Sequence, residues 1–560
     1  MKDNRVLSHL PNEILSMIFN YLLPSSTRDC PEDEAKAVHD SLIPVCRLFR
    51  ALFLPRRLRH LVIRSSAPRH VDFIRGIKDY PFPVHTLRTY VEKLTFQDWR
   101  TSPHVDEGNE WVASALLTRY IPALSCFPNL YELHLTDMSI TRSFFDAVAY
   151  LGALSRVSIS RCAFGAFEGA EDPYPVEPPS TPWTSFAFHD NTCSMEYIYA
   201  FVSLISSPHL QTLNTTQWTL IHALAEHEEV LLEGLHELAT QIPCTPATAL
   251  KDFLIRTPSV QTLRITSIQT FEVSLFDYTA TYNTARQLVD LPPSALPNLT
   301  CVQCSAMLLD ALVRGRPVSS IDVTSIIYSS GTVISESDHE TVRRQDFTAL
   351  MASATVPVRH LTIGMMMFNV LVHDRRLSDV QGLESLTIYV VSATYDAEHD
   401  TLKADDELPE ALSTTVERIT IVNRGITTKY DFDRVQCFLG EQVRLCRWFS
   451  RAFPSVHQIS FCSDITWHLD PDDQEWWPDI AKSKKVARAF EEVRDKIPLG
   501  RHAAQMSLHA IFPGQLYGDW RNLVQAYEYE GVTSVHRGPR DGSEGVVSHE
   551  ELQRALRWAL

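Results

Sequence analysis

Residues 130–135, with the sequence LYELHL, contain the pattern that decides the fold. An apolar residue is followed by two variable positions, a second apolar residue, one variable position and a third apolar residue. The last three positions alternate between apolar and polar, which is the period of a β-strand with one buried face. Helical periodicity follows downstream, at residues 144–151. The expected structural unit is therefore one short strand followed by one helix.

The same pattern recurs along most of the chain, in copies that lie roughly 20–50 residues apart. Repeated strand–helix units at this spacing predict an α/β solenoid in which short parallel strands stack side by side. The copies are at residues 58–63, 91–96, 130–135, 154–159, 260–265, 318–323, 358–363, 383–388, 416–421 and 456–461, with weaker ones at residues 210–214 and 299–304.

Composition and charge exclude several classes of protein. A chain of 560 residues is too long for one compact core, which favours several domains or an elongated array. The net charge of −17 disfavours nucleic acid or a membrane surface as the main partner. The eleven cysteines are odd in number and scattered, which is typical of a reducing compartment. Since no hydrophobic leader and no apolar run of about 18 residues is present, we expect a soluble intracellular protein of the cytoplasm, the nucleus or both.

Two apolar helices are expected before the repeats begin. Pro11 suits the first position of a helix, and apolar residues then recur with helical spacing on two faces as far as Leu22. A second helix has an apolar face from Val45 to Leu52 and ends at Pro55. About 50 residues bury too little surface to be stable alone, so this region is expected to pack against a partner or a neighbouring domain.

This N-terminal region resembles an F-box over residues 7–55. The motifs that carry the resemblance are Leu10-Pro11-x-Glu13-Ile14-Leu15-x-x-Ile18-Phe19-x-x-Leu22 and Leu42-x-x-Val45-Cys46-Arg47-x-Phe49-Arg50. The resemblance implies a three-helix unit that docks on the Skp adaptor of SCF ubiquitin ligases, and through it on a cullin. The implied adaptor contacts are Leu10, Pro11, Ile14, Ile18, Leu42, Val45, Cys46 and Phe49. The alternative is a plain helical cap of the solenoid.

The repeats resemble leucine-rich repeats, although most copies lack the Asn/Cys signature of that family. In such an array the residue between the last two apolar positions faces the concave surface. This rule predicts that a protein target contacts His134, Ser158, Asn214, Arg264, Gln303, Asp322, Thr362, Thr387, Thr420 and Ser460. The alternative explanation for the many Ser and Thr residues is their intrinsic preference for strands.

Three stretches without apolar periodicity, residues 165–183, 328–345 and 393–410, are interpreted as surface loops. The repeat pattern is lost after Phe461. The predicted organisation is therefore an F-box at residues 1–55, a leucine-rich-repeat-like solenoid at residues 56–461 and a C-terminal cap or small appended region at residues 462–560.

Motifs that suggest metal or redox chemistry are incomplete. Cys301 and Cys304 have the spacing of a metal-binding pair, but no second pair follows, and strand geometry points them to opposite faces. Two His-Glu pairs within an expected helix at residues 220–239 are not completed to H-E-x-x-H. Residues 541–551 resemble half of a calcium loop, with Arg540 where a carboxylate is required. We therefore expect neither a metal nor a cofactor.

The sequence thus favours a non-catalytic substrate-recognition subunit of an SCF-type ubiquitin ligase, with a protein target held by the repeat array. Two alternatives remain open. One is a leucine-rich-repeat scaffold without a role in ubiquitination, and the other is an enzyme whose site lies in residues 462–560.

Overall fold

The computed structural model describes residues 54–64, 87–99, 120–164, 182–266, 284–323, 347–390, 412–423, 439–461 and 465–479, with short gaps inside some of these ranges. The eight predicted adaptor contacts, the F-box helices and residues 480–560 lie outside the described residues. The chain divides into two compact units, Met1–Leu235 (unit 1) and His236–Leu560 (unit 2).

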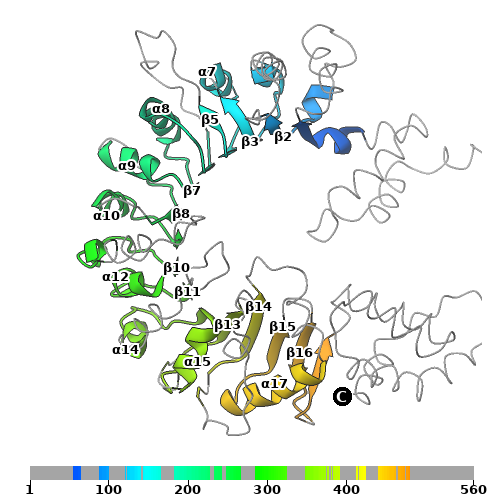
Figure 1. Cartoon of the computed structure of the whole chain (residues 1–560), viewed down its shortest axis with the longest axis vertical. Helices are drawn as coiled ribbons and strands as arrows, with labels where there is room; N and C mark the ends of the chain where they lie inside the picture. The colour runs from blue at the N-terminus through cyan, green and yellow to red at the C-terminus, as the bar shows by residue number, and fades with distance from the viewer. Residues whose placement is uncertain are drawn as a thin grey trace, which may run out of the picture. The chain divides into compact units, whose positions relative to one another are not determined.

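Unit 1 contains a sheet of parallel strands in chain order. Its strands are β1 (His60–Arg64), β2 (Lys93–Trp99), β3 (Glu132–Ile140), β4 (Arg156–Ser160), β6 (Ser185–His189) and β7 (Thr212–Thr215), while the short β5 (Ala163–Phe164) pairs with the end of β3. The helical segments between them are η2 (Arg88–Tyr90), η3 (Leu124–Cys126), α7 (Ser143–Ala149), α8 (Met195–Ile205) and α9 (Trp218–Glu226). The helices lie along one side of the strands (Figure 1).

Unit 2 has the same kind of strand and helix arrangement and ends differently. The parallel strands are β8 (Glu237–Gln241), β9 (Thr262–Thr266), β10 (Cys301–Cys304), β11 (Ser320–Val323), β12 (His360–Gly364), β13 (Ser385–Val390), β14 (Arg418–Asn423) and β15 (Gln458–Phe461). The antiparallel strands β16 (Ile465–Leu469) and β17 (Trp476–Asp479) follow. The helical segments are α10 (Thr248–Ile255), η4 (Ala306–Leu308), α12 (Leu309–Val313), α14 (Phe347–Ala352), α15 (Met365–His373) and α17 (Leu439–Ala452).

The apolar positions of the repeat form the core. In the copy at residues 130–135, Leu130, Leu133 and Leu135 are all fully buried. The same three positions are buried in the other predicted copies, except that Leu58 is half-buried. Burying one such side chain contributes about 1.5–3 kcal/mol before conformational entropy is counted. The predicted mixed α/β architecture with stacked parallel strands is therefore confirmed for the described part of the chain.

Successive turns are joined by a ladder of main-chain hydrogen bonds at the start of each strand. The carbonyl of Tyr131 accepts from the N–H groups of both Ser155 and Arg156, at 2.9 Å each. In unit 2 the carbonyl of Arg359 accepts from the two N–H groups at Glu384 and Ser385 in the same way, again at 2.9 Å. Because the main chain supplies both partners, this junction needs no particular side chain.

Asn191 provides a side-chain bridge of the kind expected from the Asn/Cys signature. Its Oδ1 accepts from the N–H of Cys162 at 2.8 Å, and its Nδ2 donates to the carbonyl of Ile159 at 3.0 Å. The Cys162 thiol lies at the equivalent point of the previous turn and donates to the carbonyl of Ser160 at 3.3 Å. These two turns thus carry the full L-x-x-L-x-L-x-x-N/C pattern.

Arg316 is a buried cation that binds only main-chain oxygens among the described residues. Its side chain is 1% exposed, and its guanidinium donates to the carbonyls of Ala311 at 2.7 Å, Ala295 at 2.9 Å and Pro292 at 3.0 Å. Burial lowers the pKa of Arg316 from its usual value. Arg316 thus links the end of α12 to the loop before β10, because it donates to carbonyls in both segments.

Two sequence predictions are corrected. Trp183, assigned to a surface loop, is fully buried and opens a further copy of the repeat with Phe186 and Phe188 on β6, because aromatic rings fill the three apolar positions. The single helix expected at residues 220–239 is also wrong. Helix α9 ends at Glu226 and strand β8 begins at Glu237, since the apolar spacing there fits a new repeat as well as a helix.

Candidate binding surface

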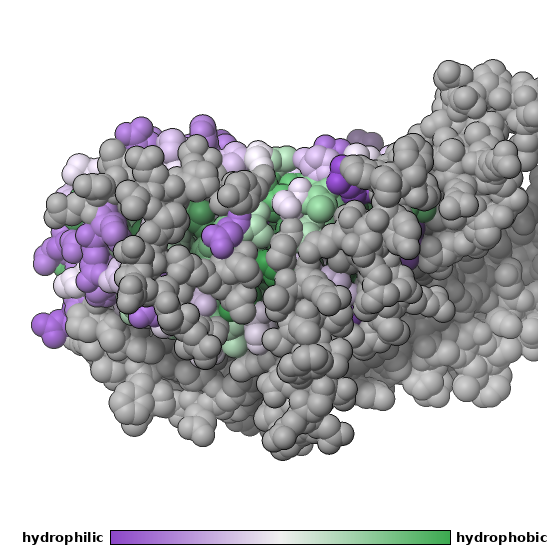
Figure 2. Space-filling model, turned by 90° about the horizontal axis from the view of Figure 1, so that it is seen from above, coloured by the Kyte–Doolittle hydropathy of each residue, from purple (hydrophilic) through white to green (hydrophobic). Residues whose placement is uncertain are grey.

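Large apolar side chains are mostly hidden in the described part of the chain. In the view of Figure 2, hydrophilic residues gather at the margins of the coloured surface and hydrophobic residues are visible in its middle. The most exposed large apolar side chains among the described residues are Met195, Ile255, Val289 and Val356, which belong to four separate segments. The most exposed large apolar side chains of the described residues are thus spread over several segments of the chain.

The residues between the buried positions, most of them polar, form rows across the strands, on the face opposite the helices. The middle row of unit 1 consists of Val62, Thr95, His134, Ser158, Ala187 and Asn214, each in register with the next. The middle row of unit 2 consists of Ala239, Arg264, Gln303, Asp322, Thr362, Thr387, Thr420 and Ser460. All ten predicted target contacts thus lie in these two rows, three in unit 1 and seven in unit 2. That they bind a target stays a prediction.

Two further rows of unit 1 were missed by the sequence analysis. The first row is His60, Lys93, Glu132, Arg156, Ser185 and Thr212, and the third row is Arg64, Gln97, Thr136, Ser160 and His189. These residues lie two positions before or after the middle row, so the strand period places them on the same face. Counting two positions each way from the middle residue would have found them. The three rows together are named the unit 1 face.

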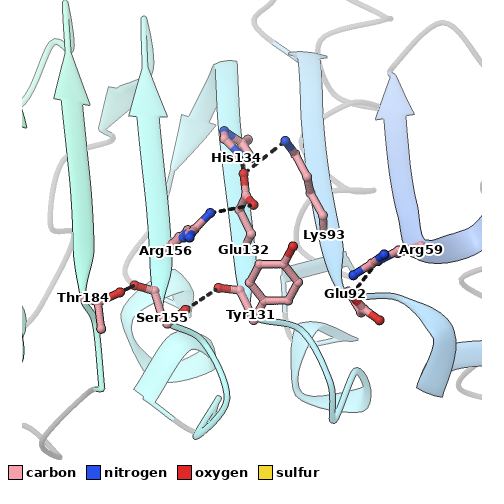
Figure 3. Close-up of polar contacts among 9 residues, drawn as sticks. All are labelled: Arg59, Glu92, Lys93, Tyr131, Glu132, His134, Ser155, Arg156 and Thr184. Atoms are coloured by element: carbon pink, nitrogen blue, oxygen red, sulfur yellow. Dashed lines mark hydrogen bonds and ion pairs between the residues drawn. The ribbon is translucent and has the colours of Figure 1, made fainter. Parts of the chain in front are cut away.

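Glu132 is the centre of a charged cluster on the unit 1 face (Figure 3). Its Oε1 lies 2.5 Å from Nε2 of His134 and 3.0 Å from Nζ of Lys93. Its Oε2 lies 3.9 Å from a terminal guanidinium nitrogen of Arg156. Lys93 is on β2, Glu132 and His134 are on β3, and Arg156 is on β4. One carboxylate therefore connects three consecutive strands.

The environment keeps this carboxylate ionised. The hydrogen bond with His134, and then the hydrogen bond and charge of Lys93, lower the pKa of Glu132 to about 2, although burial acts in the opposite direction. The Glu132 side chain is 14% exposed, against 29% for Lys93 and 61% for Arg156. The anion is thus enclosed and its cationic neighbours extend toward solvent.

A row of three aspartates and one arginine borders the carboxyl ends of the unit 1 strands. Asp98, Asp137, Arg161 and Asp190 occupy the same repeat position in four turns, and all have positive φ angles, from 51° to 61°. Asp tolerates this left-handed conformation better than most residues. Arg161 binds Asp137 in a bidentate pair at 2.8 and 2.7 Å. These four residues are named the acidic rim.

The equivalent face of unit 2 is nearly neutral and rich in hydroxyl groups. Its middle row runs through consecutive Thr residues to Ser460, whose Oγ lies 3.1 Å from Oγ1 of Thr466. Tyr389 is buried on this face, and its hydroxyl donates to the carbonyl of Val323 at 2.6 Å. Gly364 is its register partner on the strand between.

The cysteine and histidine motifs do not form a chemical site in the described residues. Cys301 is half-buried and Cys304 is fully buried on alternate sides of β10, both are free thiols, and burial raises the pKa of each. His222 pairs with Glu226 at 3.4 Å on α9. Within the described ranges, no group of three or more His, Cys, Asp or Glu side chains is arranged to hold a metal ion.

No helix in the described part of the chain combines the length and the apolar character needed to cross a bilayer.

The comparisons with known proteins add little to this geometry. No protein-family model and no curated protein matches the chain. Among solved structures, the crystal structure of an internalin from Listeria monocytogenes aligns with 57% of this chain and 88% of its own, at 11% sequence identity and a TM-score of 0.21. So loose a superposition carries no argument. The leucine-rich-repeat-like architecture rests on the strand register, the buried apolar triplets and the helices on one side of mostly parallel strands.

Proposed function

We propose that the chain is a non-catalytic substrate-recognition subunit of an SCF-type ubiquitin ligase. Its N-terminal F-box docks on the Skp adaptor, and the strand face of the repeat array holds a protein target. The observation that carries the proposal is the set of polar rows, which lie in register across the strands opposite the helices. Rows of this kind offer an extended contact surface, which is how repeat proteins commonly bind other proteins.

The character of the surface supports a protein target. The rows alternate hydrogen-bond donors and acceptors such as Gln303, Asp322 and Thr362 over many strands. A small-molecule site would need a concave apolar pocket with a few converging polar groups. The in-register succession of mostly polar side chains suits another protein surface instead, where each contact adds little and the whole area provides specificity.

The adaptor part of the proposal is supported by the F-box-like motifs around Leu10 and Leu42. A helix with two apolar faces can pack one face internally and present the other to a partner groove. The chain itself would perform no chemistry. It would raise the local concentration of a target lysine near the charged conjugating enzyme, and proximity alone accelerates such a transfer strongly.

The test compares two variants that are expected to lose different partners. The full-length chain is co-expressed with the Skp adaptor, as wild type, as Leu10→Ala/Pro11→Ala, and as Thr387→Ala/Thr420→Ala on the strand face. We expect the first variant to lose the adaptor and keep the target, and the second to keep the adaptor and bind the target more weakly. A wild-type chain that does not co-purify with the adaptor would contradict the F-box assignment.

The scaffold alternative makes a different prediction in the same experiment. A scaffold would keep its binding partner on the strand face, but deleting the chain would leave the lifetime of that partner unchanged. Measuring the half-life of the bound protein after a translation block separates the two functions. A half-life that lengthens on deletion supports the ligase subunit.

A further inference from the structure

The unit 1 face carries an excess of positive charge that its surroundings do not share. Among the residues of its three rows, Arg64, Lys93 and Arg156 are cationic and Glu132 is anionic. His60, His134 and His189 add three imidazoles to the same face. This contrasts with a whole-chain charge of −17. A local positive area on an acidic protein attracts acidic partners selectively.

The corresponding face of unit 2 is balanced. Its first and middle rows hold Arg264 and Arg418 against Glu237 and Asp322. Arg264 is also neutralised directly, by an ion pair with Glu237 at 3.0 Å. These two rows of unit 2 are thus neutral, whereas the first row of unit 1 holds two cations, Lys93 and Arg156, against the single anion Glu132.

Arg156 is the cation best placed to meet a partner. Its side chain is 61% exposed, and its ion contact with Glu132 among the described residues is 3.9 Å long, beyond hydrogen-bonding distance. In Figure 3 Arg156 approaches Glu132 from β4 while Lys93 approaches from β2. A guanidinium has five N–H donors in a planar fork that matches a carboxylate. At 3.9 Å the contact with Glu132 makes no hydrogen bond to this fork.

The acidic rim lies beside the third row, where Arg64 is in register with Gln97, the residue before Asp98, so only the cations of the first row are remote from the rim. Lys93 and Asp98 are five positions apart along β2, which corresponds to about 16 Å of strand. Charges exposed to solvent are largely screened beyond about 8 Å at physiological salt. The first row and the acidic rim therefore act as separate surfaces, and an acidic segment would lie along the first row.

We propose that the unit 1 face binds a segment of the protein target that bears aspartate or glutamate side chains. Arg156 and Lys93 contact its carboxylates, and Glu132 is a positioning residue that binds Lys93 at 3.0 Å and attracts Arg156 from 3.9 Å. This inference rests on the proposed function, because it takes the strand face to be the surface that holds the target.

The arrangement favours spaced carboxylates over one compact phosphate group. Lys93 and Arg156 lie on alternate strands, about 10 Å apart at the backbone, and the carboxylate of Glu132 lies between their charged groups. A single phosphate touching both cations would lie against that carboxylate and be repelled. Two carboxylates of an extended segment can approach the cations from their outer sides.

The experiment uses the full-length chain and a fluorescein-labelled twelve-residue probe peptide of alternating Glu and Ser, with a Gln/Ser peptide as its neutral match. Binding is followed by fluorescence anisotropy at low and moderate salt. We expect the Glu peptide to bind at least ~10-fold more tightly than the Gln peptide, with an advantage that shrinks as salt rises. Arg156→Glu is expected to weaken the affinity for the Glu peptide at least ~10-fold. Arg156→Gln is expected to weaken it by an intermediate factor.

The matched control is Arg447→Glu, which makes the same change at an exposed arginine of α17 in the helix layer. It is expected to bind the Glu peptide like the wild type. Equal binding of the Glu and Gln peptides, or an equal loss in Arg447→Glu, would overturn the proposal. Displacement of the Glu peptide by inorganic phosphate, at concentrations where free glutamate has no effect, would assign the site to phosphate and also overturn it.

Co-purification with the adaptor separates this inference from the F-box proposal. Arg156→Glu is expected to retain the Skp adaptor while losing the Glu peptide. A wild-type chain that binds the Glu peptide but not the adaptor would refute the F-box and leave the acidic-segment site standing. Circular dichroism of each variant confirms folding, and Arg156→Gln provides a second, milder change if the charge reversal disturbs β4.

Discussion

Replacing Glu132 with glutamine would loosen three strands of unit 1 at once. The carboxylate accepts hydrogen bonds from His134 and Lys93 and lies near Arg156, so β2, β3 and β4 all depend on its charge. Glutamine has almost the same shape, and it keeps one acceptor oxygen. The variant therefore removes the charge and leaves the packing of the strands nearly unchanged.

The size of the effect follows from the pKa. A shift from 4.5 to about 2 corresponds to at most about 3 kcal/mol of stabilisation by the ionised form. Lys93 and Arg156 are partly exposed, and solvent screening reduces what such pairs contribute. We therefore expect Glu132→Gln to cost about 2 kcal/mol at pH 7 in the local unfolding of these strands.

The pH dependence has a defined sign. Since the pKa of Glu132 is lower in the folded state than in the unfolded state, its stabilisation is complete above pH 4.5 and is lost as the pH falls toward 2. Between pH 7 and pH 4, linkage lowers the stabilisation by ionised Glu132 by about 0.8 kcal/mol before solvent screening is taken into account. The difference between wild type and Glu132→Gln should accordingly become smaller by roughly half a kcal/mol between pH 7 and pH 4.

Native-state hydrogen exchange, read by mass spectrometry on peptides from β2 to β4, measures this local stability. At pH 7 a loss of about 2 kcal/mol corresponds to exchange about 30-fold faster. The matched control is Glu92→Gln, because Glu92 pairs with Arg59 at 2.7 Å on a more exposed part of the same sheet. That variant should stay within about 0.5 kcal/mol of wild type. The reasoning would be refuted if Glu132→Gln exchanged at wild-type rates or if Glu92→Gln exchanged as fast as Glu132→Gln. It would also be refuted if the difference in stability between wild type and Glu132→Gln did not become smaller at pH 4.

Three further changes test the packing of the array. Arg316→Met removes the side-chain donor from the carbonyls of Ala295 and Ala311 and should cost more than about 3 kcal/mol in urea unfolding; a near-neutral result would contradict this role. Gly234→Ala would place a Cβ 2.3 Å from the carbonyl oxygen of Pro208 and should lower the melting temperature by the equivalent of about 1–3 kcal/mol. Gly152→Ala meets nothing within 4 Å and serves as its control; if both alanines behave alike, close approach at Gly234 is not the cause. Tyr389→Phe should cost about 1 kcal/mol in thermal unfolding through its buried hydrogen bond, and a melting curve that superimposes on wild type would contradict that role.

The repeat could be predicted because each turn must bury the same three side chains. Where leucine, isoleucine or valine fill those positions, the period of the strand is visible in the sequence alone. It was less visible at Trp183, because a nearby cluster of prolines and acidic residues favoured a loop. It was also hidden at Leu235 and Leu238, whose spacing fits one face of a helix as well as a strand, so that only the tertiary packing decides.

The candidate surface could be predicted in part. The residue between two buried positions must face away from the core, which placed His134 and Arg264 correctly in their rows. The cluster around Glu132 could not be found in the same way, because it depends on which strands become neighbours and in what register. Lys93 and Arg156 are 63 residues apart in the sequence, and only the parallel register brings both to the same carboxylate.

The main-chain ladder also bears on how such a gene can change over generations. At Tyr131 and Arg359 the link to the next turn consists of one carbonyl and two N–H groups, which any residue except proline supplies at the donor positions. Duplication or excision of a whole turn would therefore recreate the link at the new junction, whatever side chains meet there. An array built in this way can gain or lose turns while its sequence drifts, and the length of its contact surface can follow the size of what it binds.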